Sequence, residues 1–252
     1  MRLRHLRYVL VIACGAFFIA LSSFGQECRV TTTVRVLNEH GMSDLSLTPE
    51  QLSARIGSGS AKVVSVTQGA KPVTILLIDI SSSMKEMWAQ SVAAAKQISA
   101  GAGDRVAVVV FREQIVDHAS GREPTDKLVD RLATLKTSMG GTALYDTLID
   151  TAGAAKNPNT ALVVISDGED NASRHSSDQT VDWFLKNRWP PVFGLVLDYA
   201  HSQTRRGYFK KIVAGTGGVL AYPSSASKVA EAASELSSAI NMPFTITLQP
   251  VW

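Results

Sequence analysis

Three stretches of the sequence carry side-chain oxygens that could bind a divalent cation. Asp79, Ser81 and Ser83 form an Asp-x-Ser-x-Ser pattern at the end of an aliphatic run. Thr142 follows two glycines, and Asp167 lies near the end of a second aliphatic run. Carboxylate, hydroxyl and water oxygens are the ligands that hard cations such as Mg²⁺ prefer. An Asp followed by serines is also ordinary turn or helix-capping chemistry, so the first stretch alone does not identify a metal site.

The surrounding elements are expected to bring these residues to one edge of a sheet. Residues 73–79 and 161–166 are aliphatic runs without polar alternation, which is typical of parallel strands buried on both faces. Strand and helix patterns then alternate along the chain, which predicts an α/β fold with a doubly wound, mostly parallel sheet flanked by helices. Ligands of such sheets bind beyond the carboxyl ends of the strands, where Asp79, Thr142 and Asp167 are expected.

The set and order of these residues resemble the von Willebrand factor A (VWFA) domain. Its metal-ion-dependent adhesion site (MIDAS) is built from Asp-x-Ser-x-Ser, a Thr and an Asp, and every position has a match here: Asp79, Ser81, Ser83, Thr142 and Asp167. The resemblance implies a bound Mg²⁺, with Mn²⁺ or Ca²⁺ as alternatives. It also implies protein–protein binding or adhesion, in which a partner protein offers an Asp or Glu to the metal. Neutral hydroxyl ligands fit this role, because they leave the cation electron-poor and favour an anionic oxygen in its open position.

A Mg²⁺-dependent hydrolase is the alternative function, because a metal between two aspartates could support phosphoryl or ester hydrolysis. The sequence offers poor candidates for a base or nucleophile. His175 is the only histidine close to a candidate metal stretch, and neither Gly-x-Ser-x-Gly nor Gly-x-x-x-x-Gly-Lys occurs. A structural VWFA module with an unused metal site is a third interpretation. We expect a binding protein and not an enzyme.

The first 25 residues have the features of a secretory signal peptide. A basic stretch with three arginines precedes an apolar run over residues 8–21, and a small-x-small triplet at residues 23–25 fits cleavage before Gln26. The apolar run is short for a membrane span. An uncleaved anchor, which would tie the protein to a membrane, and a lipoprotein modified at Cys14 are the alternatives. We expect an exported protein in a periplasm, on a cell surface or in the medium.

Charge and cysteine content exclude some kinds of function. The chain has 25 Lys and Arg against 22 Asp and Glu, but three of the arginines lie in residues 1–25, which contain no acid. The remainder therefore has 22 residues of each sign, and its net charge gives no reason to expect a nucleic-acid partner. Cys28 is the only cysteine left after cleavage, so neither an internal disulfide nor a cysteine-based metal site is expected.

The chain is predicted to have four parts: a signal peptide at residues 1–25, a β-rich N-terminal extension at 26–71, the VWFA domain at 72–241, and a C-terminal strand or tail at 242–252. The layout of the extension resembles that of bacterial "VWFA-related" proteins. Strands are predicted in it over residues 30–37, 54–56 and 63–68, with a loop over 57–60, and residues 244–248 are expected to pair with them. Helices are predicted over residues 84–100, 127–135, 143–156, 176–188, 205–214 and 229–240.

Overall fold

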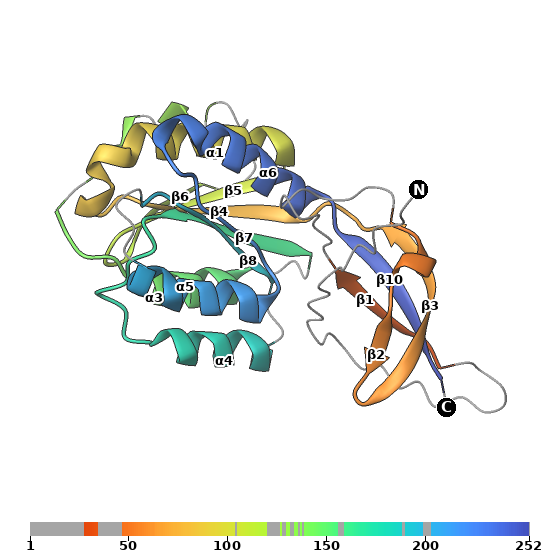
Figure 1. The fold of residues 1–252 in the computed structure, drawn as a ribbon. Helices are drawn as coiled ribbons and strands as arrows, with labels where there is room; N and C mark the ends of the chain where they lie inside the picture. The colour runs from red at the N-terminus through yellow and green to blue at the C-terminus, as the bar shows by residue number, and fades with distance from the viewer. Residues whose placement is uncertain are drawn as a thin grey trace. The chain divides into compact units, whose positions relative to one another are not determined.

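The computed structural model describes residues 28–34, 47–103, 105–119, 139–155, 159–187, 190–198 and 203–251, with isolated residues between 127 and 137. The predicted signal peptide lies outside these residues, as do residues 128, 129, 132 and 133 of the predicted helix over 127–135. The chain divides into two compact units (Figure 1). One is Lys71–Asn241, and the other combines the described parts of Met1–Ala70 and Met242–Trp252.

The larger unit is built on a six-stranded sheet in the order β6-β5-β4-β7-β8-β9, of which β4 to β8 are labelled in Figure 1. All neighbouring pairs are parallel except β5 and β6. The doubly wound, mostly parallel sheet predicted from the sequence is therefore confirmed. The chain runs outward from β4 to β5 and β6 and then returns to β7 on the other side, so the switch point of the sheet lies between β4 and β7. The strands are β4 (Val73–Asp79), β5 (Val106–Phe111), β6 (Ile115–Ala119), β7 (Thr160–Ser166), β8 (Val192–Val196) and β9 (Leu220–Ala221).

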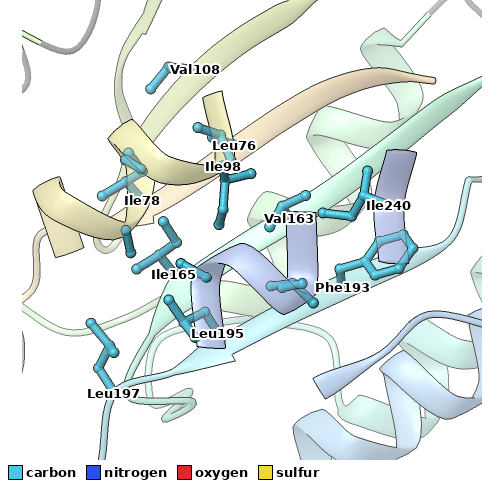
Figure 2. Close-up of a cluster of buried hydrophobic side chains, with 14 of the residues drawn as sticks. Leu76, Ile78, Ile98, Val108, Val163, Ile165, Phe193, Leu195, Leu197 and Ile240 are labelled. Carbon is cyan, nitrogen blue, oxygen red and sulfur yellow. The ribbon is translucent and has the colours of Figure 1, made fainter. Parts of the chain in front are cut away.

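Helices cover both faces of this sheet (Figure 1). On one face, α1 (Trp88–Ala102) and α6 (Val229–Asn241) pack through Ile98 and Ile240 against side chains such as Leu76 (Figure 2). On the other face, α3 (Leu144–Ala154), α4 (Ser177–Asn187) and α5 (Gln203–Thr216) pack against Leu77 and its neighbours. Leu76 and Leu77 are consecutive and belong to different cores, because successive strand residues point to opposite faces. Both faces are buried, which explains the absence of polar alternation in the sequence.

The start of α1 differs from its prediction. The helix expected over residues 84–100 begins as a 3-10 helix, η2 (Ser82–Met87), and becomes α-helical only at Trp88. Met84 N–H donates to Ser81 O (3.1 Å), an i to i+3 bond that winds the chain more tightly than an α-helix. Met84 is fully buried, so this tight turn brings the chain into the core directly after the serine-containing loop.

The smaller unit is a four-stranded antiparallel sheet in the order β1-β10-β3-β2, with a 3-10 turn η1 (Pro49–Gln51). Its strands are β1 (Val30–Val34), β2 (Ala54–Ile56), β3 (Gly59–Gln68) and β10 (Phe244–Pro250). The pairing of residues 244–248 with the N-terminal extension is confirmed, because β10 lies between β1 and β3. The loop predicted over 57–60 is wrong in extent: β3 starts at Gly59, and Gly57, with a φ of 60°, begins a two-residue hairpin turn.

The smaller unit has its own apolar core, to which both ends of the chain contribute. Its buried members are Val34, Leu47, Ala54, Val63, Phe244, Ile246 and Leu248. In the described part of the chain, neither unit contains a helix that is long and apolar enough to cross a membrane.

Candidate metal centre

The first candidate stretch leaves β4 at its carboxyl end. Asp79 is the last residue of the strand, and its side chain is fully buried. Asp79 Oδ1 accepts a hydrogen bond from the Ser81 backbone N–H (2.8 Å), which closes a tight turn of the kind that aspartates favour. Beyond this turn, Ser81 Oγ and Ser83 Oγ lie 3.1 Å apart. A buried carboxylate and a pair of hydroxyl oxygens therefore share one short loop.

The second candidate aspartate directly follows β7, the neighbour of β4. Ser166 ends β7 and donates from Oγ to Asp79 Oδ2 (2.7 Å), which ties the two strand ends together. Asp167 is 7% exposed, and its Oδ1 accepts a hydrogen bond from Glu169 N–H (3.1 Å). Gly168 then adopts a φ of 82°, which L side chains rarely allow. Asp79 and Asp167 therefore lie on adjacent strand ends at the switch point of the sheet.

The third candidate stretch comes directly before α3. Thr142 is 1% exposed. Its backbone N–H donates to Asn171 Oδ1 (2.8 Å), and its carbonyl accepts from Asn171 N–H (3.0 Å), so it is held by the loop that follows β7. One residue pair also links this stretch to the serine loop, because Ser82 Oγ donates to Gly140 O at 3.4 Å. Among the hydrogen bonds of the described residues, none joins the Thr142 side chain directly to the other four candidates.

Sequence reasoning missed Ser166 and Asn171. Ser166 is a hydroxyl at the end of an aliphatic run, next to Asp167, so its position in the sequence was a usable signal. Asn171 lies in an acidic loop, and its contact with Thr142 spans 29 residues of sequence. No local pattern indicates a contact of that kind.

The buried position of Asp79 disfavours its charged form. Burial raises the pKa of Asp79 to about 6, and the nearby Asp167 adds to this, although hydrogen bonds from Ser81 and Ser166 act in the opposite direction. A divalent cation next to the two carboxylates would favour their charged forms. A cation would therefore stabilise the charged forms of Asp79 and Asp167.

The donor atoms fit a hard cation held by oxygen ligands. The candidates supply two carboxylates and three hydroxyls. Neighbouring ligands of an octahedral Mg²⁺ with bonds of about 2.1 Å lie about 3.0 Å apart, close to the 3.1 Å between Ser81 Oγ and Ser83 Oγ. The described residues contain no group of three or more His, Cys, Asp or Glu side chains gathered for a metal. The chemistry of this edge is therefore that of carboxylate and hydroxyl oxygens.

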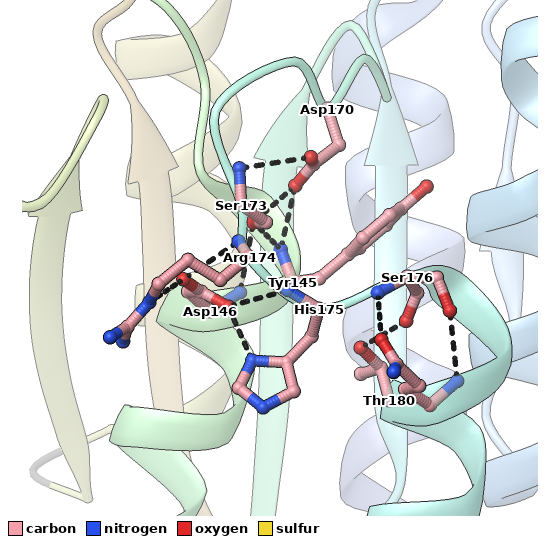
Figure 3. Close-up of polar contacts among 9 residues, drawn as sticks. Tyr145, Asp146, Asp170, Ser173, Arg174, His175, Ser176 and Thr180 are labelled. Carbon is pink, nitrogen blue, oxygen red and sulfur yellow. Dashed lines mark hydrogen bonds and ion pairs between the residues drawn. The ribbon is translucent and has the colours of Figure 1, made fainter.

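Side chains of the loop after β7 also cap the start of α3 (Figure 3). Asp170 Oδ2 and Ser173 Oγ each accept a hydrogen bond from Tyr145 N–H (3.0 Å), and Ser173 Oγ accepts another from Asp146 N–H (3.0 Å). These oxygens satisfy N–H groups that have no partner within the helix. The loop that carries Asp167 is therefore fixed to the helix that follows Thr142.

Asp146 strengthens this attachment from the helix side. Its carboxylate accepts hydrogen bonds from Arg174 N–H (3.0 Å), Arg174 Nε (3.1 Å) and His175 N–H (3.2 Å), and it pairs with His175 Nδ1 (2.6 Å) (Figure 3). Burial raises the pKa of Asp146, but the hydrogen bonds together outweigh it and hold that pKa well below its usual range. The ring of His175, the histidine closest in sequence to a candidate metal stretch, is thus bound to Asp146.

Comparison with protein-family models places the chain in a family. The model described as "VWA domain containing CoxE-like protein" matches residues 33–186, which is more than half of the chain. The chain belongs to the von Willebrand factor A (VWA) domain family. This confirms the family resemblance seen in the sequence. VWA domains generally mediate protein–protein interactions.

Solved structures share this VWA fold. The von Willebrand factor type A protein from Catenulispora acidiphila is 13% identical with a TM-score of 0.52, and the match covers 91% of this chain and 67% of that one. The pilus adhesin SpaC from Lactobacillus rhamnosus GG is 11% identical with a TM-score of 0.50, covering 87% and 42%. A chain from the complex between subunits BchI and BchD of magnesium chelatase is 14% identical with a TM-score of 0.50, covering 69% and 97%.

These identities establish the shared fold alone. The chain spans less than half of the pilus adhesin structure that it resembles. No curated protein matches the chain.

Proposed function

We propose that this VWA protein binds another protein through a complete MIDAS. The metal is Mg²⁺, with Mn²⁺ or Ca²⁺ as substitutes, and an Asp or Glu of the partner completes its coordination. The observation that carries this proposal is the pair of buried carboxylates, Asp79 and Asp167, beside two hydroxyl oxygens 3.1 Å apart at the switch point of the sheet. The proposed ligand set is Asp79, Ser81, Ser83, Thr142 and Asp167.

The proposed ligands fall into two groups, neutral hydroxyls and charged carboxylates. The Ser81 and Ser83 hydroxyls are suited to direct coordination, and the Thr142 hydroxyl supplies a third neutral oxygen. Asp79 and Asp167 balance the charge of the cation, either directly or by accepting hydrogen bonds from its waters. The bound ion supplies a Lewis-acidic position for an anionic oxygen. Because the hydroxyls carry no charge, that position keeps its affinity for a carboxylate.

An exposed apolar side chain next to the centre supports a role in binding. Met139 lies three residues before Thr142, and it is 86% exposed. The backbone around it is held in place, because Arg112 Nη1 donates to Met139 O (2.7 Å) and Gly141 N–H donates to Glu113 Oε1 (3.1 Å). Methionine is enriched at protein interfaces. A fixed backbone that presents Met139 beside the proposed metal therefore suits contact with a partner.

Calorimetric titration of Mg²⁺ and Mn²⁺ into metal-stripped protein tests the metal site. We expect saturable binding to residues 26–252, and loss of that binding in Asp79→Ala. Asp178→Ala is the matched control, because the Asp178 carboxylate is 72% exposed and pairs with Lys211 on the surface. It should bind as the wild type does. Equal binding by Asp79→Ala and the wild type would refute the assignment of the site.

Acetate tests whether the metal accepts a carboxylate. With Mn²⁺ bound, coordinated water accelerates the relaxation of bulk water protons, and acetate should reduce this effect by replacing that water. Acetamide has a similar shape and no charge, so at the same concentration it should have little effect. If acetate and acetamide act alike, an acidic partner residue is not the ligand.

The proposal also includes export and the absence of catalysis. Alkaline phosphatase fused after residue 25 should be active in a bacterial host only outside the cytoplasm, so activity that requires the three N-terminal arginines would support export.

The absence of catalysis is tested with p-nitrophenyl phosphate. In the presence of Mg²⁺, the wild type should hydrolyse it no faster than Asp79→Ala does. A rate that depends on Asp79 would favour the hydrolase instead.

A further inference from the structure

Asn171, in the neighbouring loop, forms hydrogen bonds with the backbone of Thr142. Asn171 Oδ1 accepts a hydrogen bond from Thr142 N–H (2.8 Å), while Asn171 N–H and Ala172 N–H both donate to Thr142 O (3.0 Å each). Asn171 lies four residues after Asp167. One short segment therefore carries a proposed aspartate ligand and holds both polar backbone atoms of the proposed threonine ligand.

The two loops approach so closely that a side chain cannot fit between them. A Cβ built at Gly141 would lie 2.5 Å from Asn171 Oδ1 and 3.3 Å from Ala172 Cβ. The glycine before Thr142 is therefore explained by the position of the Asn171 side chain. The contact between Asn171 and Thr142 therefore depends on a glycine at position 141, which leaves space for the Asn171 side chain.

The segment around Asn171 is itself anchored on both sides. Asp170 and Ser173 cap α3, and Asp146 of α3 binds the backbone N–H groups of Arg174 and His175 (Figure 3). Asp170 and Ser173, on either side of Asn171, are thus fixed by contacts that do not involve Thr142. The Asn171 side chain, by contrast, contacts Thr142.

We propose that Asn171 is a positioning residue of the metal centre, which sets Thr142 in register with Asp167 for cation binding. This inference rests on the proposed function. Without the Asn171 side chain, Thr142 keeps the two hydrogen bonds to its carbonyl but loses the one that holds its N–H, so its position has to be fixed further when the cation binds. Loss of groups that orient metal ligands typically weakens metal affinity by about 10- to 100-fold. We expect Asn171→Ala to weaken Mg²⁺ binding by about tenfold.

Three variants separate positioning from general stability. Asn171→Ala removes the acceptor for Thr142 N–H, whereas Asn171→Asp keeps an acceptor oxygen and should restore Mg²⁺ affinity to within about threefold of the wild type. Ser173→Ala removes a cap of α3 in the same loop without touching Thr142. It should lower the Tm of the metal-free protein and leave the Mg²⁺ affinity within about twofold. Equal Mg²⁺ affinity in Asn171→Ala and the wild type would overturn the inference.

Hydrogen exchange of the Thr142 amide in metal-free protein gives an independent readout. Exchange should be faster in Asn171→Ala than in the wild type and unchanged in Ser173→Ala. If the wild type bound no Mg²⁺, the proposed function would fall, and with it the role of Asn171 in metal binding. If the Thr142 amide exchanged at the same rate in Asn171→Ala and the wild type, the hold of Asn171 on Thr142 would itself be disproved.

Discussion

Asp79 is a fully buried carboxylate whose surroundings disfavour its charged form when no cation is bound. Both of its carboxylate oxygens accept hydrogen bonds, one from Ser81 N–H and one from Ser166 Oγ. Neither donor carries a charge, and the side chain is fully buried. The pKa is therefore raised to about 6 by burial, even though the hydrogen bonds oppose this. Without a metal, the folded protein holds a proton at Asp79 more tightly than the unfolded chain does.

We predict that metal-free protein loses stability as the pH rises from about 4 to about 6. The stabilisation from the bound proton is complete below the ordinary pKa of 3.8 and is lost as the pH rises through about 6. The loss is on the order of 2–3 kcal/mol for a shift of about two pKa units. Asp79→Asn cannot titrate and should lack this dependence in urea denaturation. Identical pH profiles for Asp79→Asn and the wild type would contradict it.

Asp146 is the opposite case, a carboxylate whose charged form is stabilised. Asp146→Ala should lower the free energy of unfolding by about 1–3 kcal/mol, because it leaves N–H groups of Arg174 and His175 without their acceptor. Asp178→Ala should change it by about 0.5 kcal/mol or less, because that carboxylate is 72% exposed. The Asp146 contribution is present above the ordinary pKa of 3.8 and is lost as the pH falls below it. Equal losses in the two variants at pH 7 would contradict this account.

At the scale of elements, the sequence predicted the central strands because burial leaves a local signature. β4 and β7 are aliphatic along their length, and parallel pairing puts their carboxyl ends at one edge. Local patterns missed features that depend on contacts. The tight turn of η2 was not predicted because apolar spacing does not separate a 3-10 turn from an α-helix. Gly59 looks like loop chemistry, but it pairs with Ile56.

In the candidate centre too, some residues could be proposed from local sequence patterns and others could not. Its ligands could be proposed from the sequence because each lies in a recognisable local setting, at a strand end or on a glycine-containing loop. Ser166 contacts Asp79 across 87 residues of sequence and Asn171 contacts Thr142 across 29, so no local pattern indicates these two contacts, although the place of Ser166 beside Asp167 was a usable signal. Such contacts form only when the sheet brings strand ends together. The residues that connect the candidate ligands are therefore identified only from the structure, whereas the candidates themselves can be proposed from the sequence.

Two helix glycines give a matched test of the packing between elements. A Cβ at Gly101 of α1 would lie 2.0 Å from Ser237 Oγ of α6, whereas a Cβ at Gly153 of α3 would meet nothing within 4 Å. Gly101→Ala should therefore destabilise the protein by about 1–3 kcal/mol, because the Ser237 side chain has to leave its position or the two helices have to separate. Gly153→Ala should stabilise it by about 0.5 kcal/mol through helix propensity. Thermal unfolding of both variants measures this, and changes of the same sign would contradict the close packing of α1 and α6.

At the scale of the whole molecule, the larger unit is inserted in the chain within the smaller one. Lys71–Asn241 lies in the chain between β3 and β10, which pair with each other in the smaller sheet. β10 is also the only described strand that pairs with β1. The smaller sheet therefore forms only when the end of the chain returns to its beginning. Every proposed metal ligand, and Asn171, belongs to Lys71–Asn241.

We predict that deleting residues 242–252 unfolds the smaller unit and spares the metal centre. Without β10, β1 loses its partner and the smaller core loses Phe244, Ile246 and Leu248. Limited proteolysis should then cut within residues 28–70, while the Mg²⁺ affinity stays within about twofold of the wild type, because both faces of the larger sheet keep their helices. Ile246→Asp is a milder variant with the same expected outcome, since it places a charge at a side chain that is 2% exposed. A protease-sensitive smaller unit together with lost Mg²⁺ affinity would mean that the centre depends on both units.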